Sequence, residues 1–431
     1  MFKIIFFILL IIITTSCSLS EIKPENKNAK VFAQEDAYIL FALRAEQLQA
    51  YKNAAEIFTE LYQKSEKKEY LYRSIENELL LKENEKLIQR IDNNLLEDNY
   101  DAQLIRFKII ALIGLNRLDE ARDLSVDLAA KTKEENDYLL TSDVYIKRQE
   151  FDLAVKYLES AYALNHSEKI LDKMSIILYV NLSRKKEAIA HLETHSRMLG
   201  CSRLICLRLI AIYSNENNID GLLSTSLRLY EVDKSPELAA KISQYYSYKR
   251  DYLHLMIFLE KFHSDDNLLL QLYSSSKDYK KAKLLADKLY EESSDINYLG
   301  QSALFEYEGA KDKSSKTLLE SVVSKFEKVI TLDPQPMYLN YLGYILIDHS
   351  IDIKQGMRYI DKVLKLQPNS AYYLDSKAWG YYKLGRCKEA KEIMNHIVKL
   401  EGGKDAEVRG HLKMIDQCLE KKKKNKGENR K

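Results

Sequence analysis

Apolar residues recur at helical intervals along most of the chain. Tyr51, Ala54, Phe58 and Leu61 follow one another at steps of three, four and three, so they fall on one stripe of an α-helix. Two later segments repeat these steps: Phe151-Ala154-Leu158-Ala161 and Tyr279-Ala282-Ala286-Leu289. The pattern predicts a protein built from amphipathic helices.

The helices are organised as a repeat. Tyr338 to Tyr344 reads YLNYLGY, and thirty-five residues later Tyr373 to Tyr382 reads YLDSKAWGYY. A second amphipathic helix and then a break follow each segment. Since one helical hairpin cannot bury both of its apolar faces, such repeats are stable only when neighbours stack.

The segment from Tyr381 to Ala390, YYKLGRCKEA, resembles the centre of the tetratricopeptide repeat (TPR) family, commonly YYKLGRYDEA. The resemblance implies an all-α, right-handed solenoid and places Ala390 at position 20 of a 34-residue unit. The same register fits these residues along the chain: Ala54, Leu87, Ala121, Ala154, Ala188, Leu222, Leu255, Ala282, Val322 and Gly356. We therefore expect about eleven TPR-like hairpins over residues 35–404. Spacings of 27 and 40 around Ala282 together fill two periods, which indicates one shifted junction near residues 290–315.

Proline tests this register independently, because it breaks helix interiors. Pro236, Pro334, Pro336 and Pro368 all fall between repeats. After Leu400, the sequence Glu-Gly-Gly predicts a helix stop, and residues 405–420 then predict a capping helix over the last apolar face.

The N-terminus predicts export. Lys3 precedes an apolar run from Ile4 to Ile13, which is too short to span a membrane but suits a signal peptide over residues 1–16. Thr15 and Ser16 before Cys17 resemble a bacterial lipobox, which implies lipidation of Cys17; simple secretion and an uncleaved anchor are the alternatives. Ser18 in place of Asp, by resemblance to enterobacterial lipoproteins, implies an outer-membrane anchor with the protein facing the periplasm. Residues 17–34 are polar and predict a flexible tether.

Composition supports a helical array. The chain has only five prolines and thirteen glycines. The net charge of +2 is uneven, because residues 421–431 alone contribute +6 and leave the remainder at −4. The body is mildly acidic, so a nucleic-acid partner is not expected. The basic segment 421–431 is expected to be a disordered tail; contact with anionic lipid or a cell-wall polymer is the alternative.

Catalytic patterns are absent from the sequence: we find no glycine-rich phosphate loop and no Ser-His-Asp ordering. The protein is accordingly expected to be no enzyme, with no cofactor and no small-molecule substrate. His191 and His195 could share a metal with Cys201 or Cys206, since residues four apart project from one helix face. Packed and surface histidines are the favoured interpretation, so no metal site is predicted.

Four cysteines remain after Cys17, an even number that suits an oxidising compartment. Cys201 and Cys206 flank the start of one helix. Cys387, at the start of the last hairpin's second helix, could meet Cys418 in the cap. Two disulfides or four buried thiols are both compatible with the sequence.

The TPR resemblance also implies a binding groove. In that family, positions 2, 5, 9, 12 and 13 of the first helix line the concave face where partner peptides lie. In the two clearest repeats these are Met337, Asn340, Tyr344, Ile347, Asp348, Tyr372, Asp375, Trp379, Tyr382 and Lys383. Tyr344 and Trp379 share position 9 and could be aromatic anchors for a partner. Packing against a neighbouring helix or the cap is the alternative.

Together these features predict a membrane-tethered, periplasm-facing scaffold that binds other envelope proteins during complex assembly. Its architecture resembles lipoproteins that assist outer-membrane barrel or pilus secretin assembly. An adaptor or regulator of cell-wall enzymes or polymer export is the second hypothesis.

Overall fold

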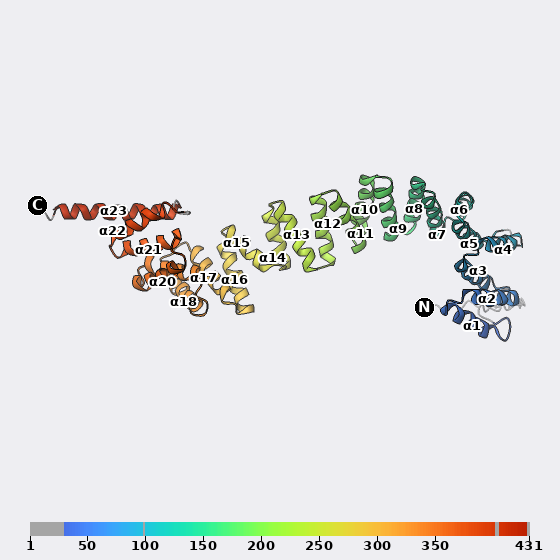
Figure 1. Cartoon of the computed structure of the whole chain (residues 1–431), viewed down its shortest axis with the longest axis horizontal. Coiled ribbons are helices and arrows are strands. Elements are labelled where there is room, and N and C mark those ends of the chain that lie inside the picture. The colour runs from blue at the N-terminus through green and yellow to red at the C-terminus, as the bar shows by residue number, and fades with distance from the viewer. Residues whose placement is uncertain (1–29, 98–99, 401–404, 429–431) are drawn as a thin grey trace, which may run out of the picture. The chain divides into compact units, whose positions relative to one another are not determined.

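The computed structural model describes residues 30–97, 100–400 and 405–428. The predicted signal peptide, the lipidation site Cys17 and residues 17–29 of the predicted tether lie outside the described residues. The described residues form helices and no strand (Figure 1). They divide into two compact units that meet in sequence at Val232 and Asp233.

The first unit contains six helical hairpins. Its helices are α1 (Glu35–Gln47), α2 (Tyr51–Ser65), α3 (Lys68–Leu81), α4 (Asn84–Glu97), α5 (Ala102–Gly114), α6 (Leu118–Thr132), α7 (Glu135–Lys147), α8 (Phe151–Asn165), α9 (Glu168–Ile176), the π-helical turn η1 (Ile177–Asn181), α10 (Lys185–Leu199), α11 (Arg203–Asn215) and α12 (Ile219–Val232).

The second unit contains five hairpins and one further helix. Its helices are α13 (Pro236–Tyr248), α14 (Tyr252–Phe262), α15 (Asp266–Ser275), α16 (Tyr279–Ser293), α17 (Ile296–Glu308), α18 (Lys316–Leu332), α19 (Pro336–Asp348), α20 (Ile353–Leu366), α21 (Ala371–Lys383), α22 (Cys387–Ile397) and α23 (Ala406–Glu428). Pro236 and Pro336 occupy the first turns of α13 and α19, where the missing N–H costs nothing.

Most hairpins turn through the same local structure. In the first, Gln49 adopts a left-handed backbone conformation (φ 58°), and the N–H of Ala50 donates to the carbonyl of Ala45 at 2.9 Å. This bond caps the first helix and reverses the chain. Equivalent left-handed residues stand at Asn116, Gln149, Asn217, Arg250, Lys277, Ser350 and Gly385. A helix-capping turn is therefore built largely without glycine, in keeping with the glycine-poor composition.

The packing positions expected from the register lie in the interior. Each predicted position-20 residue lies near the start of the second helix of a hairpin and is buried. The two helices of the α19–α20 hairpin approach closely, since a methyl group added to Gly356 would lie 2.6 Å from the carbonyl oxygen of Gly343. Small side chains at these positions let the helices touch.

Two sequence expectations differ from the structure. The irregular spacing around Ala282 has two local causes instead of one shifted junction: α14 and α15 are short, and a longer connection, residues 309–315, precedes α18. In addition, α23 extends to Glu428, so residues 421–428 of the expected disordered tail are helical. Lysine is a good helix former, and residues 421–426 contain neither Gly nor Pro to end the helix. No helix in the described part of the chain has the length and apolar character to cross a membrane.

Candidate partner-binding groove

The predicted groove residues lie on α19 and α21 of the second unit, but they differ in accessibility. Met337 and Tyr372 are exposed, at 42% and 60%. Five are half-buried, namely Asn340, Tyr344, Asp348, Tyr382 and Lys383, and three are buried, namely Ile347, Asp375 and Trp379. The face is therefore partly covered.

The cover is α23. The ring of Trp379 stacks on the imidazole of His411 from α23, with ring centroids 4.0 Å apart. Trp379 also stacks on Tyr382, with ring centroids 4.7 Å apart, and donates its indole N–H to Asp348 Oδ1 at 2.8 Å. Trp379 is only 4% exposed, so its assignment as an open anchor for a partner is wrong and the alternative, packing against the cap, holds.

Ile347 is also not a groove residue. It is fully buried in a cluster with Ile360 and Trp379. Its side chain fills the space that the missing side chain of Gly356 leaves at the α19–α20 contact. The close approach of these two helices turns position 12 of this repeat toward the core.

Tyr344 and Asp375 face the start of α23. The Tyr344 hydroxyl donates to Glu407 Oε1 at 2.9 Å, and Asp375 Oδ2 lies 2.8 Å from His411 Nδ1. Similarly, the Tyr372 hydroxyl donates to Asp405 Oδ2 at 3.1 Å. Lys383 bonds to the carbonyl of Asp348 and closes the other end of the face.

These residues leave a cavity of about 520 Å³ beside the first turn of α23. Its wall combines aromatic and acidic groups: five tyrosines (Tyr307, Tyr341, Tyr344, Tyr372, Tyr373), five carboxylates (Glu308, Asp348, Asp375, Asp405, Glu407) and one lysine, Lys313. Met337, Asn340, Ser376 and Val408 complete it. We call it the α23 pocket.

Burial and the carboxylates of the α23 pocket raise the pKa of two of its tyrosine hydroxyls. Burial, followed by the charges of Glu308 and Glu407, raises the pKa of Tyr341 to about 12. Burial, the Glu407 and Asp348 charges and the hydrogen bond to Glu407 raise the pKa of Tyr344 far above its ordinary range. Both rings are therefore neutral at physiological pH and can contact a ligand without adding negative charge.

Several lining residues were missed by the sequence analysis. Tyr307 and Glu308 occupy in α17 the places that Ile347 and Asp348 occupy in α19, counted from each helix start. The repeat register predicts these two positions, but the 40-residue spacing between Ala282 and Val322 obscured the register of this hairpin. Asp405 and Glu407 could not be found in this way, because they reach the pocket only through the docking of α23.

A larger cavity, about 680 Å³, lies in the first unit between α2 and α4. Six of its eight charged side chains pair with one another: Lys64 with Glu60, Lys86 with Glu83, and Arg90 with Glu78. The α23 pocket, with its excess of carboxylates, is the better candidate for recognition.

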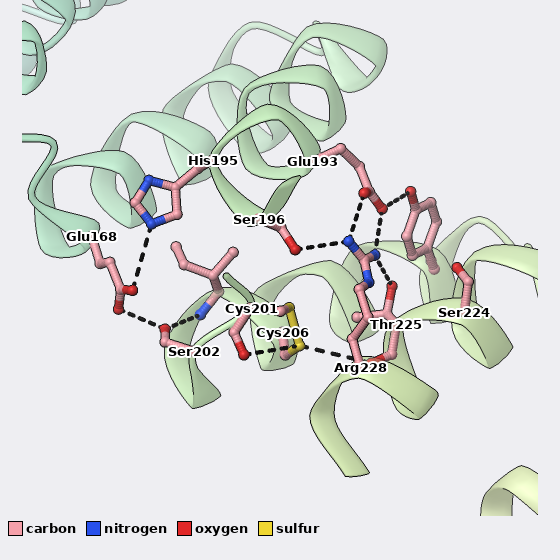
Figure 2. The surroundings of a disulfide bond; sticks show 12 residues. Glu168, Glu193, His195, Ser196, Cys201, Ser202, Cys206, Ser224, Thr225 and Arg228 are labelled. Carbon is pink, nitrogen blue, oxygen red and sulfur yellow. Dashed lines mark hydrogen bonds and ion pairs between the residues drawn. A yellow bond between two sulfur atoms is a disulfide. The ribbon is translucent and has the colours of Figure 1, made fainter. Parts of the chain in front are cut away.

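The cysteines form two disulfides, Cys201–Cys206 and Cys387–Cys418, with Cα atoms 5.4 and 6.1 Å apart. The second ties α22 to α23 and so holds the cover of the groove in place. The first lies at the start of α11 (Figure 2), beside a polar network in which Arg228 donates to Glu193 and to Ser196 Oγ.

The structure does not assemble the metal set considered from the sequence. His195 is buried, with Nδ1 2.7 Å from the Tyr162 hydroxyl and Nε2 3.5 Å from Glu168 (Figure 2), while Cys201 and Cys206 are bonded to each other. His191 instead lies near Glu159 and Glu187, on an exposed to half-buried surface. Nothing beyond this proximity indicates a metal there.

No protein-family model and no curated protein matches this sequence. Solved structures with a similar arrangement of helices include one titled Naa15/Naa10 bound to HypK-THB (12% identity, TM-score 0.32), in which the match covers 87% of this chain and 65% of the other. Another is the APC/C hetero-tetramer Cut9-Hcn1 (10% identity, TM-score 0.37), covering 89% and 97% of the two chains. A third is MamA 41-end from Desulfovibrio magneticus RS-1 (15%, 0.32), covering 38% and 94%.

Scores this low carry no argument about function, and the fold rests on the hairpins themselves. Each has two antiparallel helices and a buried small or apolar residue at the expected position, and most share the same turn. The protein is an all-α solenoid of TPR-like hairpins. Of the two cavities described above, the α23 pocket has the larger excess of acidic over basic lining residues.

Proposed function

We propose that this protein is a non-catalytic scaffold, tethered to the outer membrane through Cys17 and facing the periplasm, that binds other envelope proteins during complex assembly. The α23 pocket is the observation that supports it most. Its wall comes from three consecutive hairpins and α23 and contains five tyrosines, so it offers a preformed surface rich in a residue type that is enriched at binding hot spots.

The two disulfides agree with an oxidising compartment, and the lipobox-like residues before Cys17 support the anchor. Cys17→Ser tests the anchor directly. We expect the wild-type chain in the outer-membrane fraction and the variant in the soluble fraction; equal fractionation of the two would contradict tethering by lipid.

Purification of the tagged chain from detergent-solubilised envelope tests the scaffold role. Barrel proteins or secretion-machine components that co-purify with the wild type, and are lost from a chain lacking residues 405–431, would support it. Recovery of cell-wall synthases or of sedimenting peptidoglycan would instead favour the adaptor hypothesis.

A further inference from the structure

The α23 pocket carries more negative charge than its own cations neutralise. Lys313 lies 2.8 Å from Glu308, and Lys383 lies 3.4 Å from Asp348. Asp405 and Glu407 accept hydrogen bonds from tyrosine hydroxyls, but no cation of the described chain lies within ion-pair distance of either. The pocket therefore has two lining carboxylates without an ion-pair partner among the described residues: Asp405, directly before α23, and Glu407, in its first turn.

Two buried acceptors in the wall are also unused. Asp375 is 6% exposed; its Oδ2 meets His411, yet its Oδ1 makes no hydrogen bond with any described residue. Asn340 Oδ1 is likewise buried and accepts no hydrogen bond from a described residue. A buried acceptor without a donor costs roughly 1–3 kcal/mol, so both oxygens would gain from a ligand that brings N–H groups.

The aromatic groups suit the same ligand. Five tyrosine rings line the cavity, and ring faces attract ammonium and guanidinium groups. From this combination we propose that the α23 pocket binds a basic side chain, arginine or lysine, presented by a partner polypeptide. This inference rests on the scaffold function proposed above and names the chemistry that its partner presents.

The lysines in the described part of α23 do not reach this pocket within the same molecule. Glu407 and Lys421 are fourteen residues apart on the continuous helix α23, which places them about 21 Å apart along its axis. The helix carries the lysines away from the pocket. We therefore assign the occupant to another polypeptide.

Selection from a random nonapeptide library on the immobilised full-length chain tests the proposal. We expect the selected peptides to be enriched in Arg or Lys. The best of them should bind at least tenfold more weakly when its basic residue is replaced by citrulline or acetyl-lysine. The double variant Asp375→Asn/Glu407→Gln should lose at least tenfold in affinity for the same peptide, whereas Glu420→Gln, an exposed acid farther along α23, should not.

Asp375 is buried, so the double variant could lose affinity through misfolding. Glu407→Gln alone is the second variant: Glu407 is exposed, and the glutamine oxygen can still accept the hydrogen bond from Tyr344. It should fold like the wild type and bind the peptide more weakly. No enrichment, selection of acidic or purely apolar peptides, or equal binding by the double variant would overturn the proposal. So would self-association through this pocket that disappears when residues 421–431 are removed, because the occupant would then be a second copy. If the peptide experiment fails but envelope proteins still co-purify with the chain, the scaffold function is supported and only the binding of a basic side chain is contradicted.

Discussion

The indole of Trp379 lies flat against the imidazole of His411, with ring centroids 4.0 Å apart and planes 19° from parallel. This contact joins the last hairpin to α23, and Trp379 is the sole tryptophan of the chain. Its fluorescence therefore reports directly on whether α23 is docked.

His411→Ala should uncover Trp379. We expect a red-shifted emission maximum and a loss of about 0.5–1.5 kcal/mol in the stability of the C-terminal hairpin, the usual value of an aromatic pair. His396→Ala, at an exposed position on α22, is the matched control and should leave both unchanged. Identical spectra for the two variants would show that α23 does not cover this face.

The Cys387–Cys418 disulfide should stabilise the same docking. It closes a loop of 31 residues, against five for Cys201–Cys206. Chain entropy predicts that replacing Cys387 and Cys418 by serine lowers the free energy of unfolding by roughly 3.5 kcal/mol, and that replacing Cys201 and Cys206 lowers it by about 2 kcal/mol. Only the Cys387→Ser/Cys418→Ser variant should also shift Trp379 emission, in denaturant titrations followed by fluorescence. A spectral shift in both variants would contradict this assignment.

The structure explains why much of the fold was predictable from sequence. Helix positions, the hairpin repeat and the buried residues at position 20 follow from local periodicity, and Pro236 and Pro336 fix helix starts. The docking of α23 does not follow from it, since Tyr344 and Glu407 are 63 residues apart in sequence. The sequence left two interpretations of Trp379 open, and the structure supports packing against the cap. The register could not decide between them, because a residue on the inner face can contact either the cap or a partner.

The α19–α20 contact should not tolerate a larger residue. In Gly356→Ala, the new methyl group would meet the carbonyl oxygen of Gly343 at 2.6 Å, so the helices must separate. We expect a loss of roughly 1–3 kcal/mol, despite the better helix propensity of alanine. Gly410→Ala on α23, where nothing lies within 4 Å, should instead gain about 0.5–1 kcal/mol. Thermal unfolding followed by circular dichroism separates the two, and a stabilised Gly356→Ala would contradict the close packing.

The first hairpin should lose stability in acid through Glu35. Burial acts to raise its pKa, but hydrogen bonds from Lys67, Tyr70 and the N–H of Val31 outweigh burial and lower the pKa to about 2. A carboxylate with a lowered pKa stabilises the fold above its unfolded value of 4.5, and this contribution disappears as the pH falls from 4.5 toward 2.

Glu35→Gln should therefore unfold at a lower temperature than the wild type at pH 7, and the gap should close below pH 4.5. The neighbouring exposed variant Asp36→Asn is the control and should show a much smaller gap. Hydrogen exchange at pH 7 should locate the faster-exchanging amides of Glu35→Gln in α1. A gap at pH 2.5 as large as the gap at pH 7 would mean that Glu35 acts through something other than its charge.

Crosslinking in the cells that make this protein tests the central claim most directly. A photoreactive phenylalanine analogue at Tyr341, in the wall of the α23 pocket, should form a light-dependent adduct with an envelope protein. That adduct should disappear in the Asp375→Asn/Glu407→Gln background. The same analogue at Tyr248, which is 76% exposed on α13, should not form it. Equal adducts from both positions, or none from Tyr341, would contradict the account.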